Sequence, residues 1–325
     1  MTDNEISLNY IRNKAETDVN KLENFLKTGR LALFIITRKL VGKGTYIGFL
    51  KDLYPNKFKV ISSGEIVRSY KKALENNDED VVTLINNTFN GDSNVIELIK
   101  NATVKNLLPT EVITKLVDLE VLKSDSDVSL IFDGFPRSRE QLPYTRNLTA
   151  NLRHLGFKIL LLQIELAEGI LNERRGSRRV CPKCGRVGNI QTLYTGSVDF
   201  DSSANEFILR CDSSSCNREK MVNKVGDLEE LKTMEKREKE MDEMARVLRE
   251  EEKEIFIHLR SDIPINNFVG AEEELNHYTE LSLENGVITK NQKRQVALLE
   301  GKEVYSVDPK GIMPIIIKEI VGRLS

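Results

Sequence analysis

LALFIITRKLVGKGTY, residues 31–46, joins an apolar run to a glycine-rich turn and the start of a helical pattern. The run LALFIIT (31–37) is almost wholly apolar, as is typical of a strand buried on both faces of a parallel sheet. The turn closes with GKGT (42–45), the second half of the phosphate-binding pattern G-x-x-x-x-G-K-[ST]. Thr37 stands where that pattern has its first glycine. Three interpretations are open at this point: a working nucleotide site, a decayed one, and an ordinary strand, turn and helix.

Apolar runs alternate with helical patterns along the rest of the chain, which indicates βαβ units and a parallel sheet. The predicted fold class is therefore α/β, with a five-stranded parallel sheet flanked by helices. The four further strands are expected at FKVISSG (58–64), VSLIFDG (128–134), KILLLQIEL (158–166) and EVYSVD (303–308). Helices are expected over 5–29, TYIGFLKDLY (45–54), most of 65–107, 235–254 and MPIIIKEIVGRL (313–324), with breaks at ENNDED (75–80) and NGDSN (90–94).

Length and composition limit the classes of protein to which the chain can belong. Its 325 residues suggest one large or two ordinary domains. The net charge of −2 gives no bulk electrostatic reason to expect nucleic acid or an anionic membrane as a partner. No apolar run approaches the length of a membrane span, and the N-terminus lacks the pattern of a signal peptide. We therefore expect a cytoplasmic protein, and we expect it to be a monomer.

Two motifs downstream decide between the interpretations of the glycine-rich turn. VISSGEIVRS (60–69) ends the second predicted strand, and LIFDGFPRSREQ (130–141) ends the third. The order of a P-loop, S-[ST]-G-[DE]-x-x-R and DGFPR-x-x-x-Q resembles the adenylate kinase family of nucleoside monophosphate kinases. The third motif matches that family at every defining position, and the resemblance covers roughly two-thirds of the chain.

The resemblance implies a P-loop NTPase-type core with two insertions that close over the substrates. It also leaves two segments unexplained, an amphipathic helix at the N-terminus and a polar segment near the C-terminus. The division that we predict is an N-terminal extension (1–30), a core (31–64, 109–175, 224–258 and 303–325), a helical acceptor-binding insertion (65–108), a zinc lid (176–223) and an insertion atypical of the family (259–302).

The activity that the resemblance implies is Mg²⁺-dependent transfer of the γ-phosphate of ATP to AMP, which yields ADP. Such a transfer brings highly charged groups together, so catalysis is mostly positioning and charge stabilisation by lysine and arginine. On the ATP side the matching residues are Gly42, Lys43, Gly44, Thr45 and Arg174. On the AMP side they are Ser63, Arg68, Arg137, Gln141 and Arg178, and Asp133 matches the carboxylate that orients water on the magnesium ion.

The predicted catalytic group consists of Lys43, Arg137, Arg174, Arg178 and Arg237. Arg237 is the least direct match, because the R-x-D-D element that the family has in this region appears only as KVGD (224–227). Ser63 and Gln141 favour an adenine base, and a kinase for UMP or CMP is the alternative.

The P-loop itself departs from the family in two places, since Thr37 and Leu40 each replace a glycine. Glycine at such positions permits a positive φ or a close approach to phosphate. Either the loop follows a path that these side chains allow, or the chain is a catalytically impaired nucleotide-binding protein. Arg38 and Lys39 add positive charge that could offset a poorer loop. We favour an active enzyme, because the other motifs are complete.

Four cysteines lie within one short segment, and the chain has no others. The pair in CPKC (181–184) and the pair in CDSSSC (211–216) supply four sulfur ligands, which suits a closed, structural tetrahedral Zn²⁺ site. Disulfides are the less favoured interpretation in a cytosolic protein. A free-standing zinc ribbon that binds nucleic acid is also disfavoured, because basic and aromatic residues are not interleaved around the cysteines. The predicted metal ligands are Cys181, Cys184, Cys211 and Cys216.

Overall fold

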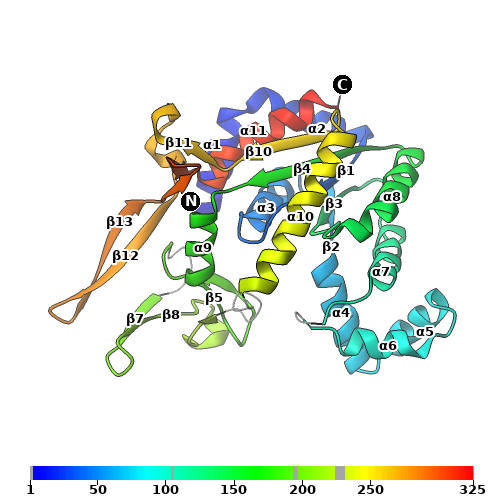
Figure 1. Cartoon of the computed structure of the whole chain (residues 1–325), viewed down its shortest axis with the longest axis horizontal. Helices are drawn as coiled ribbons and strands as arrows, with labels where there is room; N and C mark the ends of the chain where they lie inside the picture. The colour runs from blue at the N-terminus through cyan, green and yellow to red at the C-terminus, as the bar shows by residue number, and fades with distance from the viewer. Residues whose placement is uncertain (1–2, 104–105, 193–196, 224–230, 325) are drawn as a thin grey trace.

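A parallel five-stranded sheet forms the centre of the molecule (Figure 1). The computed structural model describes residues 3–103, 106–192, 197–223 and 231–324. The strand order is β10-β4-β1-β3-β2, and every neighbouring pair is parallel. The predicted α/β class is thus confirmed. The strands are β1 (Arg30–Ile35), β2 (Phe58–Ser62), β3 (Ser129–Asp133), β4 (Phe157–Glu165) and β10 (Phe256–Arg260).

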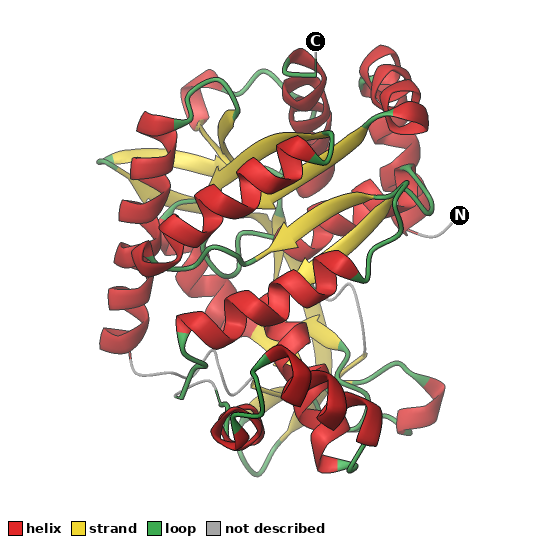
Figure 2. Ribbon diagram, turned by 90° about the vertical axis from the view of Figure 1, so that its right-hand side faces the viewer, coloured by secondary structure: helices red, strands yellow, loops and turns green. Residues whose placement is uncertain are grey.

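The central strand β1 is apolar after Arg30 because helices cover both faces of the sheet (Figure 2). Leu31, Leu33 and Ile35 point into one buried cluster, while Ala32 and Phe34 point into the other. The first cluster includes residues of α1 (Asp3–Lys14), α2 (Glu16–Thr28), α3 (Lys43–Leu53), α9 (Glu168–Ser177) and α11 (Pro309–Gly322). The second includes residues of α7 (Thr110–Leu122), α8 (Leu142–His154) and α10 (Leu231–Glu251).

The fifth strand is not the one that the sequence predicted. EVYSVD forms β15 (Lys302–Ser306), which pairs antiparallel with β11 (Asp262–Pro264) and β14 (Val296–Leu299) in a separate sheet. The edge of the main sheet is instead β10, which pairs with β4. Phe256 and Ile257 of β10 are buried but His258 is exposed, so this edge strand lacks the long apolar run of a central one.

The predicted insertion 259–302 is largely strand. Its most prominent part is a hairpin of β12 (His277–Glu284) and β13 (Val287–Arg294), which projects away from the main sheet (Figure 1). The turn is Asn285-Gly286, and both residues have positive φ, 51° and 80°. This is the backbone that a two-residue hairpin turn requires.

The N-terminal segment was predicted as one helix over 5–29, and that prediction was wrong. The chain forms α1 and α2, which are separated at Ala15, whose φ of −133° lies outside the helical range. Both helices contact α11. Tyr10 and Lys14 of α1 also bond to Glu274, with 3.1 Å between the lysine Nζ and the carboxylate. The two segments without a counterpart in the family's pattern are therefore in contact with each other.

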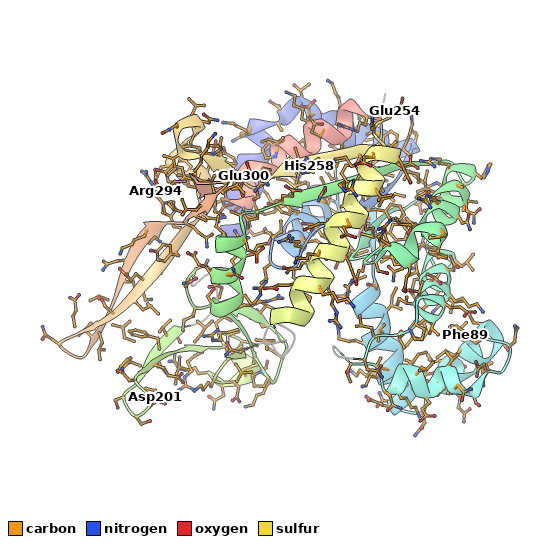
Figure 3. The ribbon with its side chains drawn as sticks, in the orientation of Figure 1. Phe89, Asp201, Glu254, His258, Arg294 and Glu300 are labelled. Carbon is orange, nitrogen blue, oxygen red and sulfur yellow. The ribbon has the colours of Figure 1, made fainter. Side chains whose placement is uncertain are left out.

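Two smaller elements extend from the same side of the main sheet (Figure 1). One is helical and confirms the predicted breaks: α4 (Ser63–Glu75), α5 (Glu79–Thr88) and α6 (Ser93–Lys100). The other contains the cysteines and the strands β5 (Arg178–Val180), β6 (Val187–Asn189), β7 (Ser197–Asp201), β8 (Glu206–Arg210) and β9 (Val222–Asn223). Figure 3 labels Phe89 in the first element and Asp201 at the tip of the second. Among the described helices, none has both the length and the apolar character that a bilayer span needs.

Candidate functional site

The register of the main sheet brings the three motif loops to one edge. Asp133 at the end of β3 is paired with Ile35 of β1 and with Ser62 of β2. The P-loop and the chain segments that begin at Ser63 and Gly134 therefore start at the same level. In open parallel sheets the carboxyl ends of the strands are where ligands bind.

The P-loop accommodates its two missing glycines in different ways. Thr37 is buried, does not have a positive φ, and its hydroxyl donates a hydrogen bond to the carbonyl of Ile164 in β4. Leu40, in contrast, has a φ of 69°, and Gly42 has a φ of 106°. A left-handed conformation costs a residue with a Cβ about 1–2 kcal/mol. The loop is therefore compatible with Thr37, whereas Leu40 holds a strained backbone that must be stabilised by its surroundings.

Arg174 of α9 contacts the strained part of the loop. Its Nη1 donates to the carbonyls of Leu40, at 2.9 Å, and of Val41, at 3.2 Å. Its Nη2 donates to the hydroxyl of Ser306, at 3.2 Å. The guanidinium thus joins α9, the P-loop and the end of β15. The sequence implied a role for Arg174 toward ATP but gave no sign of Ser306, because a lone serine within a strand belongs to none of the motifs.

Arg38 does not add free positive charge to the loop, contrary to the suggestion from the sequence. It forms ion pairs with Asp242 and Glu238 of α10 and, at 2.5 Å, with Glu168 at the start of α9. Hydrogen bonding to Asp242 raises the pKa of Arg38. Its charge is balanced by carboxylates, so Arg38 ties the P-loop to two helices.

Lys43 and Asp133 face each other across the site. Lys43 begins α3, and its Nζ lies 2.6 Å from an oxygen of Asp133 at the end of β3. Burial lowers the pKa of Lys43, and the Asp133 carboxylate opposes that shift. Gly44 and Thr45 form the first turn of α3 and are exposed. The N-terminus of a helix with a lysine beside it is an anion-binding arrangement.

Three arginines converge on the other side of Asp133. Arg137 is exposed to solvent on one side, but desolvation by the surrounding protein atoms lowers its pKa. The charges of Arg68 and Arg237 lower the pKa further, whereas the carboxylate of Asp133 raises it. A Cβ on Gly64 would lie 3.4 Å from Nη1 of Arg68 and 3.8 Å from Nη2 of Arg137. The two guanidinium groups therefore reach the same point. Mutual repulsion of this kind is relieved when a multivalent anion binds.

Two backbone features hold Arg137 in this position. Its Nε donates to the carbonyl of Gly134 at 2.6 Å, and its backbone N–H donates to the side chain of Gln141 at 2.7 Å. Gly134 has a φ of 68°, and a Cβ there would lie only 2.6 Å from Nη2 of Arg137. The hydroxyl of Ser63 donates to the same Gly134 carbonyl at 2.9 Å. Ser63 thus connects the second and third motifs, and Gln141 braces the third motif internally, in addition to any role toward a base.

Two further predicted residues lie on α10 and at the start of β5. Arg237 lies on α10 and is half-buried, and Arg178 begins β5 directly after α9. The family's R-x-D-D position, KVGD (224–227), lies outside the described residues.

The four cysteines form one compact cluster. Their Sγ atoms all lie within 4.8 Å of one another, and the pairs Cys181–Cys216 and Cys184–Cys211 are each 3.7 Å apart. A zinc tetrahedron with Zn–S bonds of about 2.3 Å has S···S edges of about 3.8 Å. The CPKC turn ends at Gly185, whose φ is 73° and whose N–H donates to the Cys181 carbonyl. The donor set and its spacing therefore fit a four-sulfur zinc site.

Comparison with known proteins finds relatives that are named adenylate kinase. The adenylate kinase of Kosmotoga olearia is 36% identical over 88 residues, which are 27% of this chain and 40% of that protein. The enzyme of Syntrophomonas wolfei is 31% identical over 150 residues, 46% and 60% of the two chains. That of Thermotoga maritima is 28% identical over 153 residues, 47% and 60%. The matches thus span about half the length of these curated relatives, and no model of a protein family matches the chain. The resemblance to the adenylate kinase family is confirmed, at modest identity and over part of each chain.

Proposed function

Since the chain is related to the adenylate kinases, we propose that it is a nucleoside monophosphate kinase that transfers the γ-phosphate of ATP directly to AMP. The observation that supports this most is the convergence of Lys43, Asp133, Arg68 and Arg137 at the carboxyl edge of a parallel sheet. A phosphoryl group in the transition state of its transfer needs cations on both the donor side and the acceptor side. The P-loop and Lys43 form one side of this site, and the arginines form the other.

The residues of the site have different roles in the proposed reaction. The P-loop backbone and Lys43 hold the β- and γ-phosphates of ATP. Arg68 and Arg137 hold the phosphate of AMP in line with the transferring group. Arg174 and Arg178 balance charge from the lid side, and Arg237 does so from α10. The acceptor is already an anion, so no general base is needed.

Magnesium enters with ATP, and two side chains suit it. The Thr45 hydroxyl and the Asp133 carboxylate are hard oxygen donors of the kind that Mg²⁺ accepts, directly or through its water ligands. Bound there, the ion would neutralise charge on the phosphates. Zinc has a separate place in the proposal, as the structural ion of the cysteine cluster.

The test of the proposed function is ADP formation by the purified chain from ATP, Mg²⁺ and one acceptor at a time: AMP, UMP, CMP or GMP. We expect turnover with AMP, because the Gln141 carboxamide is held by the Arg137 backbone and can present its NH₂ to an adenine edge. Turnover with UMP or CMP alone would correct the acceptor. If the folded chain turns over none of the four, the proposed kinase activity is wrong.

Replacement of Arg68 by alanine is expected to raise the KM for AMP by about tenfold or more, because a charge-assisted hydrogen bond to phosphate is lost. The KM for ATP should stay within about twofold, since Arg68 lies on the acceptor side. Lys72→Ala, an exposed residue of the same helix, is the matched control. An equal rise in both KM values would contradict the assignment of Arg68 to the acceptor.

A further inference from the structure

The segment from 261 to 306, which we call the brace, lies along helix α9. At the start of α9 the carboxylate of Asp262 accepts a hydrogen bond of 2.6 Å from the N–H of Ala167. Two residues on, the Cβ of Ala297 lies 3.1 Å from the point where Gly169 would carry a Cβ. Further along, Nε2 of Gln295 donates to the carboxylate of Glu173 at 2.9 Å. The brace therefore contacts α9 at three successive levels.

The last contact of the brace reaches the P-loop. The hydroxyl of Ser306 accepts from Nη2 of Arg174, at 3.2 Å, and from Nδ2 of Asn276, at 2.9 Å. Nη1 of the same guanidinium donates to the carbonyls of Leu40 and Val41. Ser306 is completely buried, and Asn276 and Gln295 are nearly so. Buried polar groups are costly unless they are bonded, so these bonds fix one orientation of Arg174.

We propose that Gln295 and Ser306 are positioning residues for Arg174, and that the brace thereby holds the P-loop in its phosphate-binding shape. The loop needs such support because Leu40 takes a left-handed conformation where glycine would be unstrained. Arg174 binds the carbonyl of that same residue, and the brace orients Arg174 from the opposite side. The KM for AMP can be measured only if the proposed kinase function is correct, whereas the Kd for MgATP can be measured without it.

The brace also contacts the lid. The N–H of Thr279 in β12 donates to the carbonyl of Gln191 in the cysteine-containing element, at 2.5 Å. In Figure 3, Arg294 marks the base of the β12–β13 hairpin, directly before Gln295. One segment thus contacts both the helix before the lid and the lid itself.

The experiment measures the Kd for MgATP by calorimetry in the full chain with its zinc. Gln295→Met and Ser306→Ala are each expected to weaken ATP binding by about 5- to 10-fold, the size of one ordinary hydrogen bond. The KM for AMP should change by less than about twofold. Gln292→Met, in the same hairpin but exposed, is the matched control and should leave the Kd unchanged.

Action through Arg174 is tested by repeating both changes in an Arg174→Ala background. There they should have no further effect on the Kd, because residues that act through one group are not additive. Equal effects in both backgrounds, or a wild-type Kd in both single variants that fold, would overturn the proposal. A wild-type chain that binds ATP but turns over no acceptor would refute the kinase function and leave the positioning test intact. A wild-type chain that does not bind ATP would refute both.

Discussion

Lys43→Met is expected to lower kcat by at least about a hundredfold, as loss of a preorganised charge at the reacting phosphate does. Methionine has nearly the length of lysine, so the start of α3 should keep its shape. Lys43 is placed for this role by the helix that begins at it and by the strand end that carries Asp133. The measurement is ADP formation from ATP, AMP and Mg²⁺ at saturating nucleotide.

Two controls separate loss of the charge from loss of structure. Lys51→Met, an exposed residue of the same helix, should keep the wild-type rate. The ion pair of Lys43 with Asp133 means that Lys43→Met leaves a carboxylate without its cation, which could lower stability. Lys43→Met combined with Asp133→Asn removes both charges and should recover stability without recovering turnover. A wild-type rate in Lys43→Met would show that the loop is not the donor-phosphate site.

The sequence predicted four of the five strands of the main sheet. β1, β2, β3 and β4 are predominantly apolar, and each was placed within a few residues of its observed bounds. β10 was missed because FIHLR is short and has an exposed histidine at its centre, so it shows no apolar run. EVYSVD was assigned to the main sheet because it has strand character, yet strand character does not reveal the pairing partner.

The site was predictable to the extent that it depends on short motifs. The segments 42–45, 63–68 and 133–141 meet because parallel strands end at one edge, and that follows from the order of the motifs along the chain. The support of Arg174 was not predictable, since Ser306 and Gln295 are distant in sequence and carry no motif. Such contacts arise from the tertiary structure alone, and only coordinates reveal them.

Cys184→Ser is expected to lower bound zinc from about one equivalent per chain to a small fraction, because structural zinc of this type needs all four sulfur ligands. Cys184 is exposed, whereas the other three cysteines are buried. Serine at this position should therefore have little effect other than through the metal. Zinc is measured on dialysed protein by elemental analysis, and Ser215→Ala, a neighbour of Cys216, is the control.

The same substitution should unfold the lid and spare the core. The buried cluster of the lid consists of three cysteines, Leu209 and Met221, with Ile190 and Val198 packed against it. So small an apolar core supplies too little free energy to order a domain without a metal or a disulfide. We expect hydrogen exchange in 178–192 and 197–223 to lose its protection, while the strands of the main sheet keep theirs. Zinc retained at one equivalent in Cys184→Ser would contradict the four-cysteine site, and a lid that stays protected without zinc would show that its small core is sufficient.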